Sequence, residues 1–510
     1  MLKVFNSIFL EIKQNKLAYL FLLLLLIIAF FLRVYRAEDL IGFYYDQGRD
    51  ALVIWRFWNE GKLFLVGPVT GLAGIFLGPL YYYLIAPFYL LGRGDPIFVA
   101  YFLAFISTLA LLVVYVLGKE MHSRTAGLFA VLLCAISYYI VLAGRWVSNP
   151  TPILLTSVLL LWALWEIAKG NKNSHILWPV VAFLVGASMQ FESASGVFYI
   201  PIVIIFSLVF KSNFPSPKTF LISFFIFFLT LLPQILFNFR HDNLLFNNFY
   251  KVIVEQKSFR LNFWDVLNIR LAYFWDVFQS KLFLGLTKYS HAISLLSFLT
   301  LLYFRNSLNK NIFIIFGIFF AVPAFFYILF QGNYGNIYDY YLTGYYLPMI
   351  LFFAIGLAVL FKSSFMGKLV VSLFFIGFLY QNSILLRNFL NAGVDGPTHI
   401  TLGNQKQAVN WIYDNAYKNN IKSYNIDVYV PPVIPYAYDY LFLWIGERRC
   451  GKSLCGYDKK EKQSVLYVLY EVDPPHPERL ENWLLKYQGN TKILEESRFG
   501  GIFVQRRERI

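Results

Sequence analysis

The sequence predicts an all-α polytopic membrane bundle that carries a small α/β domain at its C-terminal end. Of its 510 residues, 58% are hydrophobic, whereas a soluble domain has about 45–50%. Long apolar runs recur from residue 17 to about residue 386. Each run is close to the ~20 residues that a helix needs to cross the hydrocarbon core. Beyond residue 386 the pattern changes to alternating helix-like and strand-like stretches.

The first apolar run, residues 17–32, is predicted to be a membrane anchor. It leads into Arg33 and not into a small-residue cleavage site, as a signal peptide would. Further membrane helices are predicted over residues 97–118, 125–144, 152–168, 176–190, 194–210, 218–237, 285–304, 312–330, 344–361 and 367–386. Segment 76–92 is also apolar, but Pro79 and Pro87 interrupt it. We therefore expect it to be re-entrant or interfacial.

The basic residues of the loops predict the orientation of these helices. Pairs of Lys and Arg recur in every second loop, at Lys119/Arg124, Lys169/Lys172, Lys211/Lys218, Arg305/Lys310 and Lys362/Lys368. Because cytoplasmic loops are enriched in these residues, we expect eleven crossings, with the N-terminus inside and the C-terminal tail outside. If segment 76–92 also crosses, there are twelve and the basic pairs fall outside. The fold class is thus a bundle of about 11–13 transmembrane helices, and topology accounts for the net charge of +15 without a nucleic-acid partner.

The predicted organisation has two parts. Residues 1–386 form the transmembrane module, with large outer loops at 33–96 and 238–284. Residues 387–510 form a soluble α/β domain on the extracytoplasmic side. Cys450 and Cys455 in this domain bracket a short turn, and they could form a disulfide if the domain lies outside the cytoplasm.

The main candidate for chemistry lies in the first outer loop, in the stretch Tyr44–Asp50, which is flanked by aromatic residues. Asp46 is a candidate general base, because a carboxylate fixed at the membrane surface can take a proton from an acceptor. The alternative is that Asp46 caps the helix that follows. Asp50 is four residues further on and is either a partner of Arg49 or Arg56 or part of an acceptor or sugar pocket.

Cations on the outer side are candidates for binding a phosphate, because arginine makes bidentate contacts with one. The candidates are Arg49, Arg145, Arg240 and His241. Arg145 could instead be a helix-end residue whose side chain reaches towards the interface. A metal site at the lone His241 is a weak alternative.

Three further outer residues are candidates for an acceptor or sugar pocket. Glu192 occupies a tight turn between two apolar helices, where a carboxylate without a partner is costly. Tyr338 and Tyr340 belong to a tyrosine cluster that could stack on a sugar or form the aromatic belt of a membrane interface.

Nucleotide-driven chemistry is not indicated. The sequence has no Walker loop, no dinucleotide-binding fingerprint, no HExxH helix and no serine elbow. A reaction would need an activated substrate that reaches the outer face through the membrane.

The order of several short motifs resembles the membrane glycosyltransferases of the C-type fold, in particular the protein O-mannosyltransferases and the bacterial aminoarabinose transferases of lipid A. The motifs are Asp46-Gln47-Gly48, Gly78-Pro79-Leu80-Tyr81-Tyr82, Gly118-Lys119 to Arg124, the Gly186–Glu192 turn, and Pro233 to His241. The resemblance covers roughly residues 17–390, and it places the family's first-loop aspartate on Asp46. The mannosyltransferases often follow that aspartate with Glu, whereas this chain has Gln47.

The resemblance implies inverting transfer of a sugar from a polyprenyl-phosphate donor to a lipid, glycan or protein acceptor, on the outer face of the cell membrane. It specifies no cofactor and leaves a divalent cation open, although Gln47 removes one metal ligand. A lipid or sugar transporter or flippase is the alternative function, for which internal repeats and midplane ionisable residues would be typical. A non-catalytic scaffold that binds partners through its tail is a third.

Overall fold

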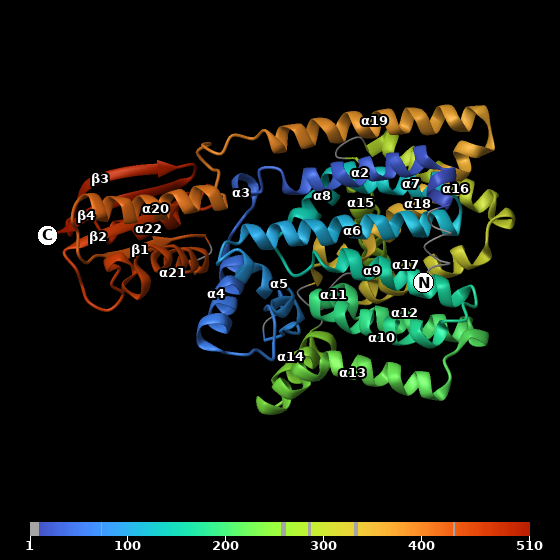
Figure 1. The fold of residues 1–510 in the computed structure, drawn as a ribbon, viewed down its shortest axis with the longest axis horizontal. Coiled ribbons are helices and arrows are strands. Elements are labelled where there is room, and N and C mark those ends of the chain that lie inside the picture. The colour runs from blue at the N-terminus through green and yellow to red at the C-terminus, as the bar shows by residue number, and fades with distance from the viewer. Residues whose placement is uncertain (1–9, 73, 257–261, 284–286, 331–334, 432–433) are drawn as a thin grey trace.

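The structure, a computed structural model, describes residues 10–72, 74–256, 262–283, 287–330, 335–431 and 434–510. Long helices lie side by side in one bundle, and a domain with a four-stranded sheet sits at one end of it (Figure 1). The predicted fold class is therefore confirmed.

The bundle consists of long apolar helices and a few shorter ones. Its helices are α2 (Lys16–Val34), α6 (Ile97–Met121), α7 (Arg124–Ile136), α8 (Tyr138–Arg145), α9 (Ile153–Ala168), α10 (Ser174–Phe191), α11 (Ser193–Gly196), α12 (Tyr199–Val209), α13 (Pro217–Arg240), α14 (Leu244–Tyr250), α15 (Phe263–Ser280), α16 (Thr287–Tyr303), α17 (Lys310–Leu329), α18 (Thr343–Ser363) and α19 (Phe365–Leu390). Within the described ranges, seven helices are long and apolar enough to cross a membrane, or up to eight if α7 and α8 form one span. The chain is thus a multi-pass membrane protein, and eleven crossings remain a prediction.

The predicted helix 125–144 is broken in the structure. α7 and α8 meet at an angle of 68° on either side of Ser137, whose hydroxyl accepts the N–H of Ile140 and caps α8. The same hydroxyl donates to the Lys281 carbonyl at 2.6 Å. The kink places Arg145 against the end of α2.

Contacts between turns show which loops lie together at one end of the bundle. Lys169 Nζ lies 2.9 Å from Glu120 Oε2, and the Asn213 side chain donates to the Ile167 carbonyl at 2.8 Å. The turns after α6, α9 and α12, each with a predicted basic pair, therefore share one end. The C-terminal domain lies at the other end.

Segment 76–92 contains α5, which runs over Leu80–Leu91, and Pro87 lies inside it. With 12 residues, α5 is about 18 Å long, too short for a hydrocarbon core of about 30 Å. Because α9 and α12 are also shorter than a full span, length alone does not decide the point, and the expectation that this segment does not cross stays a prediction. α5 accompanies α3 (Ala37–Leu40) and α4 (Tyr45–Glu60) at the end of the bundle that carries the C-terminal domain.

The C-terminal domain combines helices with one mixed sheet. Its elements are α20 (Leu402–Lys418), β1 (Asn425–Tyr429), α21 (Tyr436–Cys450), β2 (Val465–Glu471), α22 (Pro477–Leu485), β3 (Thr491–Phe499) and β4 (Ile502–Arg509). The strand order is β1-β2-β4-β3, with β1 parallel to β2 and the other pairs antiparallel. A disulfide joins Cys450 to Cys455, as the sequence suggested.

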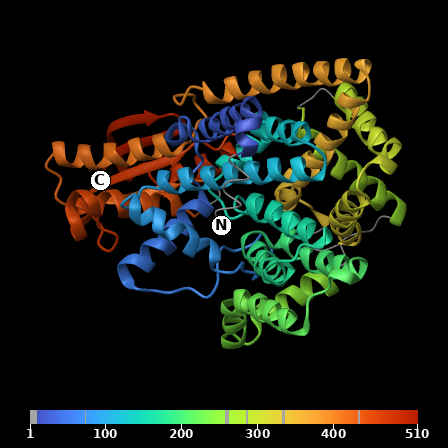
Figure 2. The same ribbon diagram turned by 45° about the vertical axis from the view of Figure 1, so that its right-hand side comes forward.

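This domain is docked on the first loop, and in the turned view of Figure 2 the two again lie next to each other at one side of the bundle. Lys406 Nζ contacts Glu38 at 2.7 Å and Asp95 at 3.0 Å. A Cβ added at Gly48 would lie 2.2 Å from the backbone nitrogen of Ala437. The backbone of α4 therefore packs directly on α21, and the first loop and the tail form one unit.

Candidate functional site

Asp46 lies in the first turn of α4 at the end of the bundle that faces the C-terminal domain. Tyr44 is the N-cap residue, and its N–H donates to Gln47 Oε1 at 3.1 Å. Asp46 is therefore not the cap, and the capping alternative is wrong. Its side chain is 58% exposed and lies 2.8 Å from Arg49 Nη1, so the carboxylate is both oriented and open to a substrate.

Arg49 lies between two carboxylates. Its Nη2 contacts Asp50 Oδ1 at 2.8 Å, and only 14% of the arginine side chain is exposed. Asp50 is buried and also accepts the Tyr82 hydroxyl at 2.9 Å. Burial raises the pKa of Asp50 to about 6, although Arg49 and Tyr82 oppose the shift. Arg49 thus holds Asp46 in place. Its single positive charge is shared between two carboxyl groups, those of Asp46 and Asp50.

Arg145 is buried at the end of α8. Its Nη1 donates to the carbonyls of Leu32 at 2.7 Å and Tyr35 at 3.0 Å, and its guanidinium lies over the Phe389 ring. In this position Arg145 completes the hydrogen bonding at the end of α2. Arg145 thus has a helix-end role, but its side chain is buried and does not reach the interface. Its Nη2 has no hydrogen-bond partner among the described residues, and phosphate binding by Arg145 stays a prediction.

Arg240 and His241 lie at the C-terminal end of α13, and both are exposed. The His241 ring stacks on Phe237 at 4.0 Å. Within the described residues, no ion pair joins either one to Asp46 or Asp50. Arg240 is an exposed cation and His241 an exposed imidazole, both at the end of α13 that leads into α14 (Figure 1).

Glu192 is buried at the turn between α10 and α11. Its Oε1 accepts the N–H of Ala194 at 3.2 Å, and burial raises its pKa to about 8. The Tyr327 hydroxyl donates to the Ala194 carbonyl at 2.7 Å, and the Ser195 hydroxyl donates to the Tyr341 carbonyl at 2.5 Å. The Glu192 turn is thus joined to the tyrosine cluster.

Tyr338 and Tyr340 are stacked, with ring centroids 5.7 Å apart and planes 4° from parallel. Trp146 meets Tyr340 edge-on at 6.1 Å, and 39% of Trp146 and 46% of Tyr338 are exposed. An exposed aromatic wall of this kind could stack on a sugar ring.

Hydrogen bonds connect α4 to the Glu192 turn through the turn after α8. The Gln47 side chain donates to the Val147 carbonyl at 3.0 Å, and Asn149 donates to the Phe191 carbonyl at 2.7 Å. The structure therefore brings Asp46, Arg49 and Asp50 into one cluster and links it through Gln47 and Asn149 to the turn that carries Glu192. Gln47, the departure from the mannosyltransferase pattern, has a structural role here.

Sequence reasoning missed a charged pair in this region. Lys281 Nζ contacts Asp339 Oδ2 at 2.8 Å and is only 2% exposed, and it lies over the Tyr346 ring at 4.4 Å. Asp339 stood out in its loop because of its charge. Nothing in the sequence indicated a partner 58 residues away.

The tail also contributes a buried acid near α4. Glu471 accepts the Tyr438 hydroxyl at 2.8 Å, and burial raises the pKa of Glu471 to about 7. It lines a cavity of about 20 Å³ with Tyr44, Tyr45 and Gln405, which is enough for about one water molecule. In the described part of the chain no three His, Cys, Asp or Glu residues group as metal ligands, and a divalent cation remains an untested prediction.

We expect Glu192→Gln to remove a pH dependence of stability. A Glu192 pKa of about 8 in the folded state, against about 4.3 in an unfolded chain, means that the folded state holds the proton more tightly. The protonated Glu192 side chain stabilises the folded state fully below about pH 4. This stabilisation is lost as the pH rises to about 8. Thermal unfolding from pH 5 to 9 should show wild type losing stability relative to Glu192→Gln. Parallel curves for the two proteins would contradict the buried position of Glu192.

Comparison with protein families gives one match. A family model described as dolichyl-phosphate-mannose-protein mannosyltransferase matches residues 77–237, which include α5 and most of α13. No curated protein matches the sequence.

Comparison with solved structures matches nearly the whole chain. ArnT from Cupriavidus metallidurans in the apo state has a TM-score of 0.60 and 11% sequence identity, with 97% of this chain and 98% of that chain covered. ArnT bound to undecaprenyl phosphate has a TM-score of 0.57, also at 11% identity, with 96% and 98% covered. The Archaeoglobus fulgidus oligosaccharyltransferase in complex with zinc and sulfate has a TM-score of 0.50 at 12% identity, with 89% and 68% covered. At these identities the likeness establishes the fold.

Proposed function

We propose that this chain, a membrane glycosyltransferase of the C-type fold, moves a sugar from a polyprenyl-phosphate donor to an acceptor on the outer face of the cell membrane. The matched family is named for dolichyl-phosphate-mannose, and a structure of similar fold holds undecaprenyl phosphate. Both support a lipid-phosphate donor. The acceptor is a lipid, a glycan or a protein.

The exposed carboxylate of Asp46 is the observation that carries the proposal. Arg49 fixes it at 2.8 Å, and it faces open space beside the C-terminal domain. In the proposed reaction Asp46 removes the proton of the acceptor nucleophile as that nucleophile bonds to the anomeric carbon. The bond from this carbon to the phosphate oxygen breaks, and the lipid phosphate leaves with the electron pair. Attack opposite the leaving group inverts the configuration.

The leaving phosphate gains negative charge and needs positive partners. Arg240 and His241 are exposed and can meet a phosphate without giving up an ion pair, whereas Arg49 is held by Asp46 and Asp50. We therefore rank Arg240 and His241 first for this role and Arg49 next. Loss of one such donor typically lowers the rate by about 10²–10³.

The acceptor or sugar pocket is proposed to lie between α4 and the tyrosine cluster. Tyr338 and Tyr340 offer aromatic faces, and Glu192 lies behind them as a buried acid. Asp50 acts through Arg49 by fixing its guanidinium.

A membrane assay tests the proposed function. Membranes that contain the wild-type chain are given radiolabelled polyprenyl-phosphate sugars, and labelled products are isolated. The expected result is a glycosylated product whose anomeric configuration, determined by NMR, is opposite to that of the donor. Retained configuration would overturn the single-displacement mechanism. Movement of the donor across the membrane without product would favour a transporter or flippase.

A further inference from the structure

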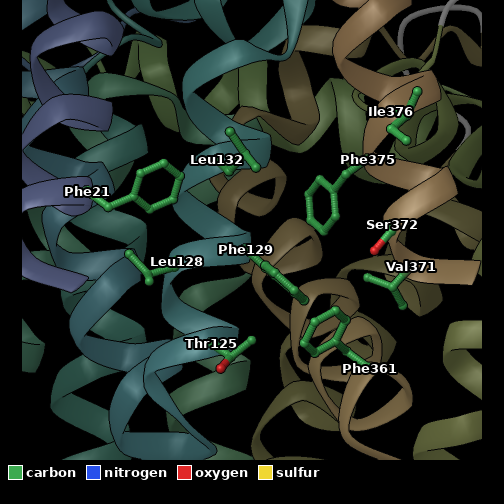
Figure 3. Close-up of a pocket in the computed structure, with 10 residues that line it drawn as sticks. All are labelled: Phe21, Thr125, Leu128, Phe129, Leu132, Phe361, Val371, Ser372, Phe375 and Ile376. Atoms are coloured by element: carbon green, nitrogen blue, oxygen red, sulfur yellow. The ribbon is translucent and has the colours of Figure 1, made fainter. Parts of the chain in front are cut away.

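An apolar groove lies at the end of the bundle opposite the C-terminal domain. It has a volume of about 380 Å³ and is lined by residues of α2, α7, α18 and α19, among them Phe21, Thr125, Phe361 and Ser372. Figure 3 shows these side chains with aromatic rings on both walls. Phe21 is 42% exposed, so the groove opens to the surface that faces lipid.

The groove begins at the basic end of the bundle. Thr125 is the second residue of α7, and Phe361 lies in the last turn of α18. On α7 the lining extends to Leu132, a rise of about 10 Å. The groove thus runs from the membrane interface through about a third of a hydrocarbon core of about 30 Å.

Basic residues lie at the end of the bundle where the groove begins, and three of the four helices that line it contribute one. Arg124 precedes Thr125 at the start of α7, and Lys362 follows Phe361 at the end of α18. Lys368 lies one turn before Ser372 on α19, so both share a helix face. All three basic side chains are exposed.

The positive charge at this end of the groove is largely uncompensated. Arg124 lies 3.7 Å from Glu11, but the same carboxylate is 3.1 Å from Lys119. Within the described residues, Lys362 and Lys368 form no ion pair. The charge of Lys362, added to burial, lowers the pKa of His122 at the turn between α6 and α7, which places Lys362 close to that turn.

We propose that this groove and the basic residues at its end bind one anionic phospholipid, with an acyl chain in the groove and the phosphate at Arg124, Lys362 and Lys368. Basic pockets between transmembrane helices on the positively charged side attract anionic head groups, and the apolar lining suits a chain. The site lies at the opposite end from Asp46 and is separate from the proposed reaction. α7 and α19 already touch here through the rings of Phe129 and Phe375, whose centroids are 4.7 Å apart, and a lipid in this place would add to that contact.

The test measures lipid binding to the full chain purified in detergent. Phosphatidylglycerol and phosphatidylcholine with the same acyl chains are titrated while the thermal unfolding temperature is recorded, since a bound lipid raises it. We expect phosphatidylglycerol to raise it far more. The double variant Lys362→Gln/Lys368→Gln should bind phosphatidylglycerol about tenfold more weakly or worse. The matched control, Lys211→Gln/Lys218→Gln, removes two basic residues at the same end but away from the groove and should bind as wild type does.

A second variant tests the chain position separately from the charges. Ser372→Phe fills the groove and leaves the basic residues intact, and Ser372 is exposed, so the fold should tolerate it. We expect it to weaken phosphatidylglycerol binding, with native mass spectrometry reporting the lipid retained by each protein. Equal effects of the two lipids, unchanged binding by Ser372→Phe, or equal weakening in the lysine control would each overturn the proposal. Tighter binding of undecaprenyl phosphate than of phosphatidylglycerol would overturn the choice of occupant.

Discussion

Asp46→Asn should abolish transfer while the protein still folds and inserts into the membrane. The amide keeps the size of the side chain but cannot accept the acceptor's proton, and general base catalysis contributes about 10²–10⁴ in rate. Asp46 is largely exposed, so removal of its charge should change stability little. The rate is measured with a polyprenyl-phosphate sugar in membranes that contain equal amounts of each protein.

Asp39→Asn is the matched control for this experiment. Asp39 is another aspartate of the first loop with a partly exposed side chain, and it also pairs with an arginine, Arg36, at 3.0 Å. We expect Asp39→Asn to transfer at nearly the wild-type rate. Wild-type transfer by Asp46→Asn would remove Asp46 from the mechanism, and equal loss in both variants would point to a general effect of loop charge.

Gly48→Ala should separate the C-terminal domain from the first loop. In an exposed helix this change stabilises by about 0.8–1 kcal/mol. Here the added Cβ would lie 2.2 Å from the Ala437 nitrogen and 2.4 Å from its Cα. Because backbone atoms cannot move aside cheaply, overpacking should destabilise by about 1–3 kcal/mol. Lower thermal stability, faster proteolysis between α19 and α20, and reduced transfer should appear together.

Gly317→Ala is the control for that effect. Gly317 lies within α17, and a Cβ built there meets nothing within 4 Å. The same substitution in a helix should therefore be neutral or slightly stabilising. A Gly48→Ala protein as stable as Gly317→Ala would show that α4 does not pack on α21.

Much of the fold was predictable because its causes are local. Apolar runs of spanning length must be helices, since lipid offers no partner for backbone polar groups. The prolines of residues 76–92 indicated an interrupted segment, and its helix α5 is indeed short; that the segment does not cross stays a prediction. The fold that the resemblance implied is confirmed by the similar solved structures. The family model over residues 77–237 agrees with the resemblance, and the glycosyltransferase activity is a proposal. The break at Ser137 was not predictable, because it depends on a hydrogen bond to Lys281, which is distant in sequence.

The candidate site was only partly predictable. Asp46, Arg49 and Asp50 lie within one turn of helix, so their grouping followed from spacing alone. Arg145 was a candidate for binding a phosphate. In the structure it donates a hydrogen bond to Tyr35 at the end of α2, a residue 110 positions earlier in the sequence. The roles of all these residues stay predictions, as do those of the other candidates, Glu192, Arg240, His241, Tyr338 and Tyr340.

The sequence by itself determined that the chain is a membrane bundle with a small α/β domain at its C-terminal end, and that its first loop carries a group of charges within one helical turn. These properties follow from local features of the sequence, namely the length of its apolar runs and the positions of charged residues in its loops. Only the tertiary structure decided that Lys281 pairs with Asp339, that Lys406 joins the tail to Glu38 and Asp95, and that Gly48 is pressed against α21. Such contacts depend on which distant segments share a surface, and no local pattern specifies a partner across hundreds of residues.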